Sequence, residues 1–163
     1  MKNLIFTLVG ALFLFVSCQS DDLQIDEALK SDKATKVTKD MTIRSYEGFI
    51  EVVGPNFTQT GGGIATHIGT YTFVNTATFP DFAGTFSGVI TAANGDEIYY
   101  NSPVIVCDGD PNVSFCPGAP ATFTYTIDGG TGRFDGATGT ITINGPFVPE
   151  GPFTATGYAE IKY

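Results

Sequence analysis

An alternation of apolar or small residues with polar residues runs along most of this chain, and it restricts the fold more than any other feature. Between residues 64 and 77, for example, Tyr71 and Phe73 fall on one side of an extended chain, and Thr70 and Thr72 fall on the other. Successive side chains of a β-strand point to opposite faces, so a period of two indicates strands with one buried and one wet face. No segment shows the period of an amphipathic helix, and the sequence therefore predicts an all-β protein.

The alternation predicts seven strands. They span residues 42–53, 64–77, 82–91, 97–106, 121–127, 138–143 and 153–163, with a bend or a break in pairing at Pro103. An eighth, short strand is expected at 113–115 or 147–153. Small and aromatic residues share the inner faces, which is typical of narrow barrels where small residues leave room for large ones. We therefore predict an eight-stranded antiparallel β-barrel, closed so that no sheet edge is exposed.

Residues 129–139 contain five glycines, a density that regular strands and helices do not tolerate. Because strand-like sequence flanks this stretch, we interpret it as a corner where the chain turns back, with Phe134 folded inward as a plug. The structural residues of the corner are Gly130, Gly132, Arg133, Phe134, Gly136 and Gly139. We expect Arg133 to fasten the corner through an ion pair with Asp128 or Asp135.

Two segments carry a resemblance to a known group of proteins. They are residues 63–72, GIATHIGTYT, and residues 129–139, GGTGRFDGATG. Both resemble bacterial proteins of the allene-oxide-cyclase-like barrel group, and plant dirigent proteins and allene oxide cyclases share the second segment in looser form. The resemblance extends in organisation over most of residues 41–163 and implies an eight-stranded antiparallel barrel, often with a central cavity. It brings no activity to this chain, because the catalytic residues of the plant cyclases have no assigned positions in it.

The first 17 residues have the pattern of a signal peptide. Lys2 supplies a positive charge, and the apolar run at 4–16 is too short to span a bilayer. Ser17-Cys18 ends this run and resembles a bacterial lipobox, so we expect Cys18 to be diacylated and to become the mature N-terminus. The alternative is an ordinary secretory signal followed by an incidental cysteine.

An acidic cluster follows Cys18 and bears on the location of the protein. Residues 19–22, QSDD, resemble the surface-export signal of Bacteroidetes lipoproteins, although a solvated acidic linker has the same composition. With the lipid anchor, this predicts attachment to the bacterial outer membrane, exposed at the cell surface, with the periplasmic face as the alternative. We expect three parts: the signal peptide at 1–17, the lipidated cysteine and a flexible tether at 18–40, and the barrel at 41–163.

Two further cysteines, Cys107 and Cys116, are the first and last residues of a ten-residue segment. In an exported chain an even pair favours a disulfide. A metal site would need more ligands than one histidine and these two cysteines supply, so neither a metal nor another cofactor is predicted.

The net charge of −9 argues against a nucleic-acid partner, because an acidic surface repels phosphates.

We expect a non-enzymatic binding or structural module that holds a small apolar ligand in a cavity formed by His67, Tyr71, Phe73 and Phe134. The alternative is an isomerase or cyclase like the plant enzymes, with His67 as its weak candidate catalytic residue, although a core histidine hydrogen-bonded by a neighbouring strand is the simpler interpretation of that position. A homo-oligomer is suggested by analogy with the plant barrels alone.

Overall fold

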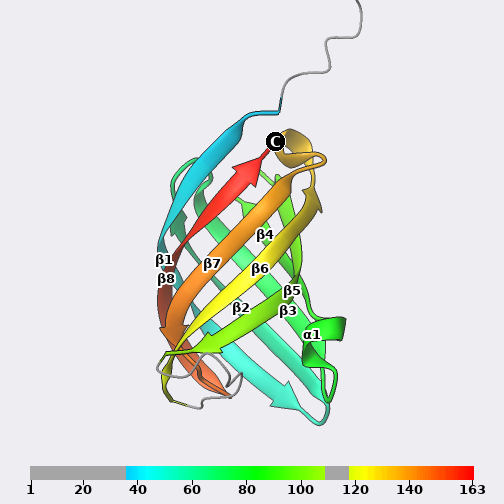
Figure 1. The fold of residues 1–163 in the computed structure, drawn as a ribbon, viewed down its shortest axis with the longest axis vertical. Helices are drawn as coiled ribbons and strands as arrows, with labels where there is room; N and C mark the ends of the chain where they lie inside the picture. The colour runs from blue at the N-terminus through cyan, green and yellow to red at the C-terminus, as the bar shows by residue number, and fades with distance from the viewer. Residues whose placement is uncertain (1–35, 109–117) are drawn as a thin grey trace, which may run out of the picture. The chain divides into compact units, whose positions relative to one another are not determined.

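Eight strands pair in chain order and close into a barrel, each antiparallel to both of its neighbours (Figure 1). The structure is a computed structural model and describes residues 36–108 and 118–163. The predicted all-β fold with a closed eight-stranded antiparallel barrel is therefore confirmed. The strands are β1 (Thr38–Val53), β2 (Asn56–Ala65), β3 (Gly69–Thr78), β4 (Ser87–Ala92), β5 (Glu97–Cys107), β6 (Pro120–Gly130), β7 (Thr138–Pro146) and β8 (Gly151–Lys162).

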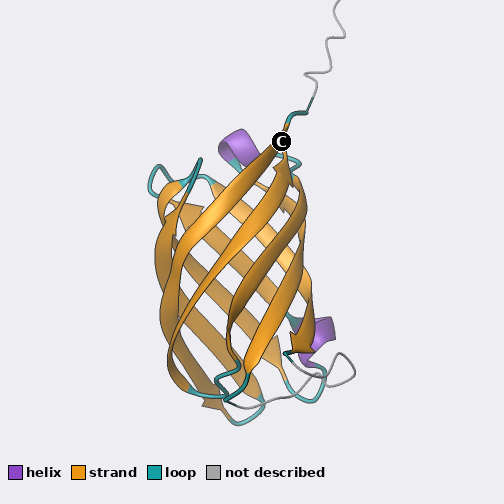
Figure 2. Cartoon of the chain, turned by 60° about the vertical axis from the view of Figure 1, so that its left-hand side comes forward, coloured by secondary structure: helices purple, strands orange, loops and turns teal. Residues whose placement is uncertain are grey.

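Two helical turns mark the two ends of the barrel (Figure 2). The 3-10 turn η2 (Gly132–Phe134) joins β6 to β7, and the short helix α1 (Phe82–Thr85) joins β3 to β4. The η2 end also carries the turns at 66–68 and 93–96, the start of β1 and the C-terminus. The α1 end carries the connections at 54–55, 79–86 and 147–150.

The eighth strand is β2, which the alternation did not predict. Of the two positions expected for it, residues 147–150 form a loop, so that prediction was wrong there, and residues 113–115 lie outside the described residues. β2 was not predicted because it contains three glycines at 61–63, and glycine usually weakens a strand. Here Gly61 and Gly63 face both the backbone of β1 and large rings of β3. A methyl group on Gly61 would collide with the Glu47 carbonyl and lie 2.7 Å from Cζ of Phe73, and one on Gly63 would collide with the Ser45 carbonyl and lie 2.7 Å from the Tyr71 hydroxyl. The glycines therefore make room for interior side chains.

The predicted strand at 82–91 begins only at Ser87, because residues 82–85 form α1. Phe82, Gly84 and Phe86 repeat with the period of a strand, but local hydrogen bonds bend the chain into a helical turn. The Asp81 carboxylate accepts from the backbone N–H of Gly84 at 3.1 Å. The Thr85 hydroxyl donates to the backbone carbonyl of Asp81 at 2.7 Å. A side-chain cap of this kind favours the first turn of a helix over an extended chain.

The interior contains the apolar side of each strand, as the alternation predicted. Ile43, Phe73, Ile98 and Ile161 are each at most 1% exposed. On β5 the pairing with β6 shifts between Asn101 and Val104, which is the irregularity predicted at Pro103. The barrel begins a little before the predicted boundary at residue 41, since β1 starts at Thr38.

The first described residues already belong to the barrel. The backbone N–H of Val37 donates to the carbonyl of Tyr163 at 3.1 Å, and the Lys36 ammonium donates to the carbonyl of Gly136. The predicted signal peptide and most of the tether lie outside the described residues. Within residues 36–108 and 118–163, no helix is long and apolar enough to cross a membrane.

Candidate functional site

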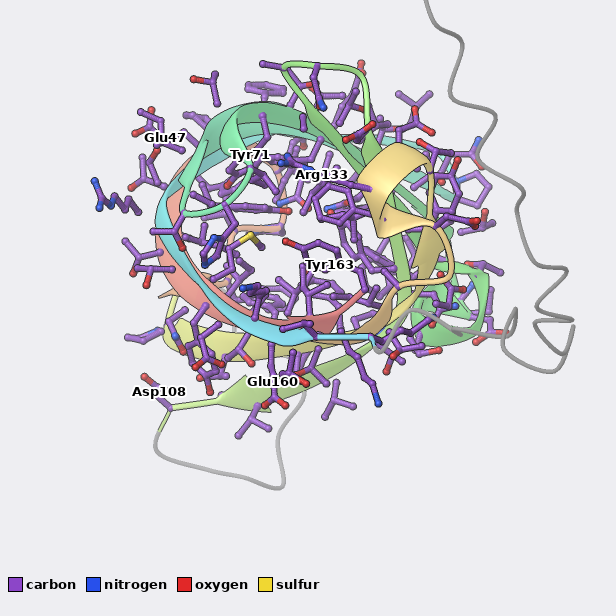
Figure 3. The ribbon with its side chains drawn as sticks, turned by 90° about the horizontal axis from the view of Figure 1, so that it is seen from above. Glu47, Tyr71, Asp108, Arg133, Glu160 and Tyr163 are labelled. Atoms are coloured by element: carbon purple, nitrogen blue, oxygen red, sulfur yellow. The ribbon has the colours of Figure 1, made fainter. Side chains whose placement is uncertain are left out.

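The glycine corner closes the η2 end of the barrel. Phe134 points inward, is 1% exposed and meets the Tyr163 ring edge-on, with ring centroids 5.0 Å apart. Viewed from this end, Tyr71 and Tyr163 lie inside the ring of strands, whereas Glu47, Asp108 and Glu160 lie outside it (Figure 3). Phe134 is thus buried as the plug that the sequence suggested.

Arg133 holds the corner, but with a different partner from the two that were predicted. Its Nε atom lies 3.3 Å from a carboxylate oxygen of Asp96, and its guanidinium lies 4.7 Å above the centre of the Phe134 ring. Asp96 belongs to the β4–β5 turn, so the ion pair joins two neighbouring turns of the barrel end. Asp128 accepts instead from the side chain of Asn101. Backbone φ angles are positive at Gly132, Gly136 and Gly139, which a side chain would strain, and Gly130 packs against Phe134.

The four residues predicted to form a cavity do not lie together around one. His67 is exposed in the turn between β2 and β3, with a φ of 68°, because β2 ends two residues earlier at Ala65. The interpretation of residues 64–77 as one strand placed it wrongly on an inner face. Tyr71 is buried, and its hydroxyl donates to the Ser45 carbonyl at 2.7 Å. Phe73 is also buried, stacked on Tyr46 with ring centroids 4.1 Å apart.

A cavity of about 300 Å³ opens at the other end of the barrel, the α1 end. Its wall is mostly aromatic. The phenylalanines that line it are Phe57, Phe79, Phe82, Phe86, Phe123, Phe147 and Phe153. Phe79 and Pro149 at its rim are exposed, whereas Gln59 and Tyr125 in its lining are buried, so the cavity runs from the surface into the barrel. Its volume is at the lower end of the range for small-molecule sites.

Helix α1 and the small residues of β7 and β8 create this space. Phe82 on α1 meets Phe57 edge-on, with ring centroids 5.0 Å apart, and also packs against Phe79 and Phe86. On the opposite wall, the inner positions are Gly145 on β7 and Ala155 on β8, which fill little volume. The helix therefore adds aromatic wall beyond the strands, while the small residues leave the interior open.

A buried polar network lies beneath the aromatic wall, with Asn75 at its centre. Asn75 is 0% exposed. Its side-chain nitrogen donates to Oε1 of Gln59 at 2.6 Å and to the Tyr46 hydroxyl at 3.0 Å. Its side-chain oxygen accepts from the Tyr100 hydroxyl at 2.6 Å. Each polar atom of the Asn75 carboxamide is thus paired, as a buried amide requires.

The interior tyrosines are kept neutral. Burial, followed by the nearby Tyr100, raises the pKa of Tyr46 well above its usual value. Burial and then Tyr46 raise the pKa of Tyr125, and burial is also the main cause of the raised pKa of Tyr100. Desolvation penalises a phenolate, so these hydroxyl groups stay protonated and able to donate.

Acid–base and metal chemistry have little support in the lining. No Asp, Glu, Lys, Arg or His is among the described residues that line the cavity. Within the described part of the chain, no three His, Cys, Asp or Glu side chains gather as they would around a metal ion. The arrangement instead suits the burial of an apolar molecule.

The cysteines predicted as sites are mostly beyond what the structure describes. Cys107 at the end of β5 is buried and disulfide-bonded. Its predicted partner Cys116 and the predicted lipidation site Cys18 lie outside the described residues, so both assignments stay predictions.

The sequence contained part of the signal for the real cavity. Phe82 and Phe86 lie at alternate positions of the strand expected at 82–91, so the period of two puts them on one face. Gln59 was missed because β2 was missed, and nothing in the local sequence marks it. No protein-family model, curated protein or solved structure matches the chain.

Proposed function

We propose that this protein is a lipid-anchored module of the bacterial cell envelope that binds a small apolar ligand in the cavity at the α1 end. The observation that carries the proposal is the cavity itself, a space of about 300 Å³ with seven phenylalanines in its lining. Apolar surface removed from water contributes roughly 25 cal/mol per Å², so a ring or short chain seated here gains affinity without any specific chemistry.

The position of the cavity supports a binding role for an anchored protein. The described chain begins beside the η2 corner, where the Lys36 ammonium donates to the Gly136 carbonyl, and the mouth lies at the α1 end. The described chain therefore begins at the end of the barrel away from the mouth. The anchor itself rests on the leader and on Cys18, with the outer membrane as the expected location and the cell surface as the expected side.

A cyclase-like or isomerase activity is the second candidate, and it has one supporting observation. Three tyrosines, Asn75 and Gln59 form a polar interior beside an apolar cavity, which could orient a substrate. The candidate catalytic residue His67 does not contribute to it, because it is exposed at the opposite end. Binding without conversion is therefore the better-supported function.

The binding proposal is tested with a cavity-filling variant of the full chain. We expect Ala155→Phe to abolish binding of the neutral apolar dye N-phenyl-1-naphthylamine, measured by native mass spectrometry of protein released from detergent. Thr156→Phe is the matched control, since Thr156 is exposed on the same strand and should leave binding unchanged. Equal binding by both variants would place the dye elsewhere and remove the proposal.

The anchor is tested separately on intact protein. In a bacterial host that processes lipoproteins, the mature chain should begin at Cys18 and carry the added mass of a diacylglyceryl group. Cys18→Ser should remain unprocessed. A mature chain that begins elsewhere, without added lipid mass, would exclude the anchor. Protease treatment of intact cells then distinguishes the surface from the periplasmic face.

A further inference from the structure

Two polar groups in the cavity lining are left without a protein partner. Oε1 of Gln59 accepts from Asn75, so the Nε2 end of the same side chain points away from that bond, and it has no hydrogen bond within the described residues. The Tyr125 hydroxyl likewise has no hydrogen-bond partner among the described residues, although the ring packs on Phe86 and Tyr100. Both residues line the cavity and are buried, at 8% and 5% exposure.

These two groups face open space. No fully buried side-chain nitrogen or oxygen in the described part of the chain lacks a partner. Nε2 of Gln59 and the Tyr125 hydroxyl have no hydrogen-bond partner, so neither atom is fully buried. The cavity that both residues line is where these atoms are accessible. Gln59 lies on β2 and Tyr125 on β6, which are opposite strands of the eight-membered ring. Donors thus reach the cavity from two sides.

Both groups donate hydrogen bonds. An amide nitrogen is a donor only, and a neutral phenol donates one hydrogen. With no charged side chain among the described lining residues, a buried carboxylate ligand would have no cation to pair with. A pure hydrocarbon would leave both donors without partners and out of reach of solvent, which costs binding free energy.

We propose that the cavity selects neutral carbonyl compounds, meaning apolar ketones, aldehydes or esters whose oxygen enters first and accepts from Tyr125 and Gln59. This inference rests on the proposed binding function and specifies its ligand class. The aromatic wall holds the hydrocarbon part, and the two donors distinguish a carbonyl from a methylene group. Carboxylic acids are excluded in their anionic form.

Probes with a shared two-ring skeleton test this selectivity. Benzophenone and diphenylmethane differ only in a carbonyl against a methylene group, and diphenylacetate adds a negative charge. In a mixture with the full chain in detergent, native mass spectrometry should show benzophenone bound at least about fivefold to tenfold more than diphenylmethane, since each net hydrogen bond to the carbonyl contributes about that factor. Diphenylacetate should not bind at neutral pH.

Tyr125→Phe is the decisive variant. Because the Tyr125 hydroxyl bonds to no described residue, its removal should leave the melting temperature nearly unchanged, and this is checked by circular dichroism. The preference for benzophenone should fall by about fivefold to tenfold, the share of one hydrogen bond, while Gln59 still donates to the carbonyl and diphenylmethane binds as well as before. Tyr158→Phe, on an exposed tyrosine, is the matched control and should keep the preference.

The outcomes separate the two proposals. If no probe binds the wild-type chain, the binding function and its ligand class both fail. If benzophenone and diphenylmethane bind equally, or if Tyr125→Phe keeps the full preference, the binding function stands and the carbonyl selectivity is overturned. Binding of diphenylacetate at neutral pH also overturns it.

Discussion

The two ends of the barrel interior follow the same alternation of side chains but differ in how completely they are filled. At the η2 end, Ile98, Ile127 and Ile161 are at most 2% exposed, and Phe134 enters from the corner to complete the packing. At the α1 end, Gly145 and Ala155 occupy the inner positions of β7 and β8, and the phenylalanines surround a space instead of filling it. Alternation therefore determines that the sheet closes, and the size of the facing residues determines whether the interior is solid.

Truncating one ring at each end tests most directly whether the two ends differ in packing. Phe134→Ala should lower the free energy of unfolding by about 3–5 kcal/mol, because a fully buried ring leaves a void in a packed region. Phe82→Ala should cost only about 1–2 kcal/mol, since its side chain is half-buried beside existing space. Chemical denaturation measures both. Only Phe82→Ala should weaken binding of the apolar dye, and equal costs for the two variants would show that the ends do not differ.

The polar network between the two ends is tested by Asn75→Leu. This change leaves the buried groups of Tyr46, Gln59 and Tyr100 without their partner, and we expect a loss of about 3 kcal/mol in the free energy of unfolding. Asn144→Leu is the control, because Asn144 is exposed and bonds only to the Thr122 hydroxyl among the described residues. A small effect of Asn75→Leu would mean that water molecules replace the hydrogen bonds that Asn75 makes.

Alkaline pH should destabilise the interior through its tyrosines. The folded-state pKa values of Tyr46, Tyr100 and Tyr125 are raised above the unfolded value near 10, so their contribution is fully present below pH 10 and is lost as the pH rises above it. The slope should approach about 1.4 kcal/mol per pH unit for each tyrosine. Absorbance at about 295 nm, the phenolate band, should show these groups ionising together with unfolding. Ionisation of all seven tyrosines in the folded barrel would contradict the burial.

The smallest effect is expected at the surface of the η2 end. Arg133→Met removes a partly exposed ion pair and the cation above the Phe134 ring, and should cost about 0.5–1 kcal/mol. Added salt should reduce the difference between this variant and the wild type, since salt screens exposed charges. Arg44→Met on the exposed face of β1 is the control. A loss much larger than 1 kcal/mol would show that Arg133, and not Phe134 alone, closes this end.

Most strand positions could be predicted from the sequence, because the period of two depends only on strand geometry, and the mixture of small and aromatic residues on the inner faces favoured closure into a barrel. The failures have local causes. β2 was missed since its glycines face the backbone of β1 and rings of β3, which is a property of the assembled barrel. Residues 82–85 look like a strand by pattern and become a helical turn through the Asp81 cap.

The candidate site was harder to predict than the fold. Its walls come from strands and loops far apart in the chain, and its polar groups depend on which atom of Gln59 bonds to Asn75. Tyr71 and Phe73 were correctly expected inside, but whether an inward residue borders a cavity or packed neighbours depends on residues across the barrel. His67 was displaced from the interior by a strand boundary of only a few residues.

The pairing of β1 with β8 has a consequence for how the chain acquires its structure. Because the first and last strands are hydrogen-bonded neighbours, the final segment must be present before the ring of strands can shut. Pairings between distant parts of a chain form slowly and leave unpaired edges exposed in the meantime. A nascent or shortened chain that lacks residues 151–162 would keep two free edges. Deletion of that last strand should therefore produce an aggregating polypeptide, not a smaller barrel.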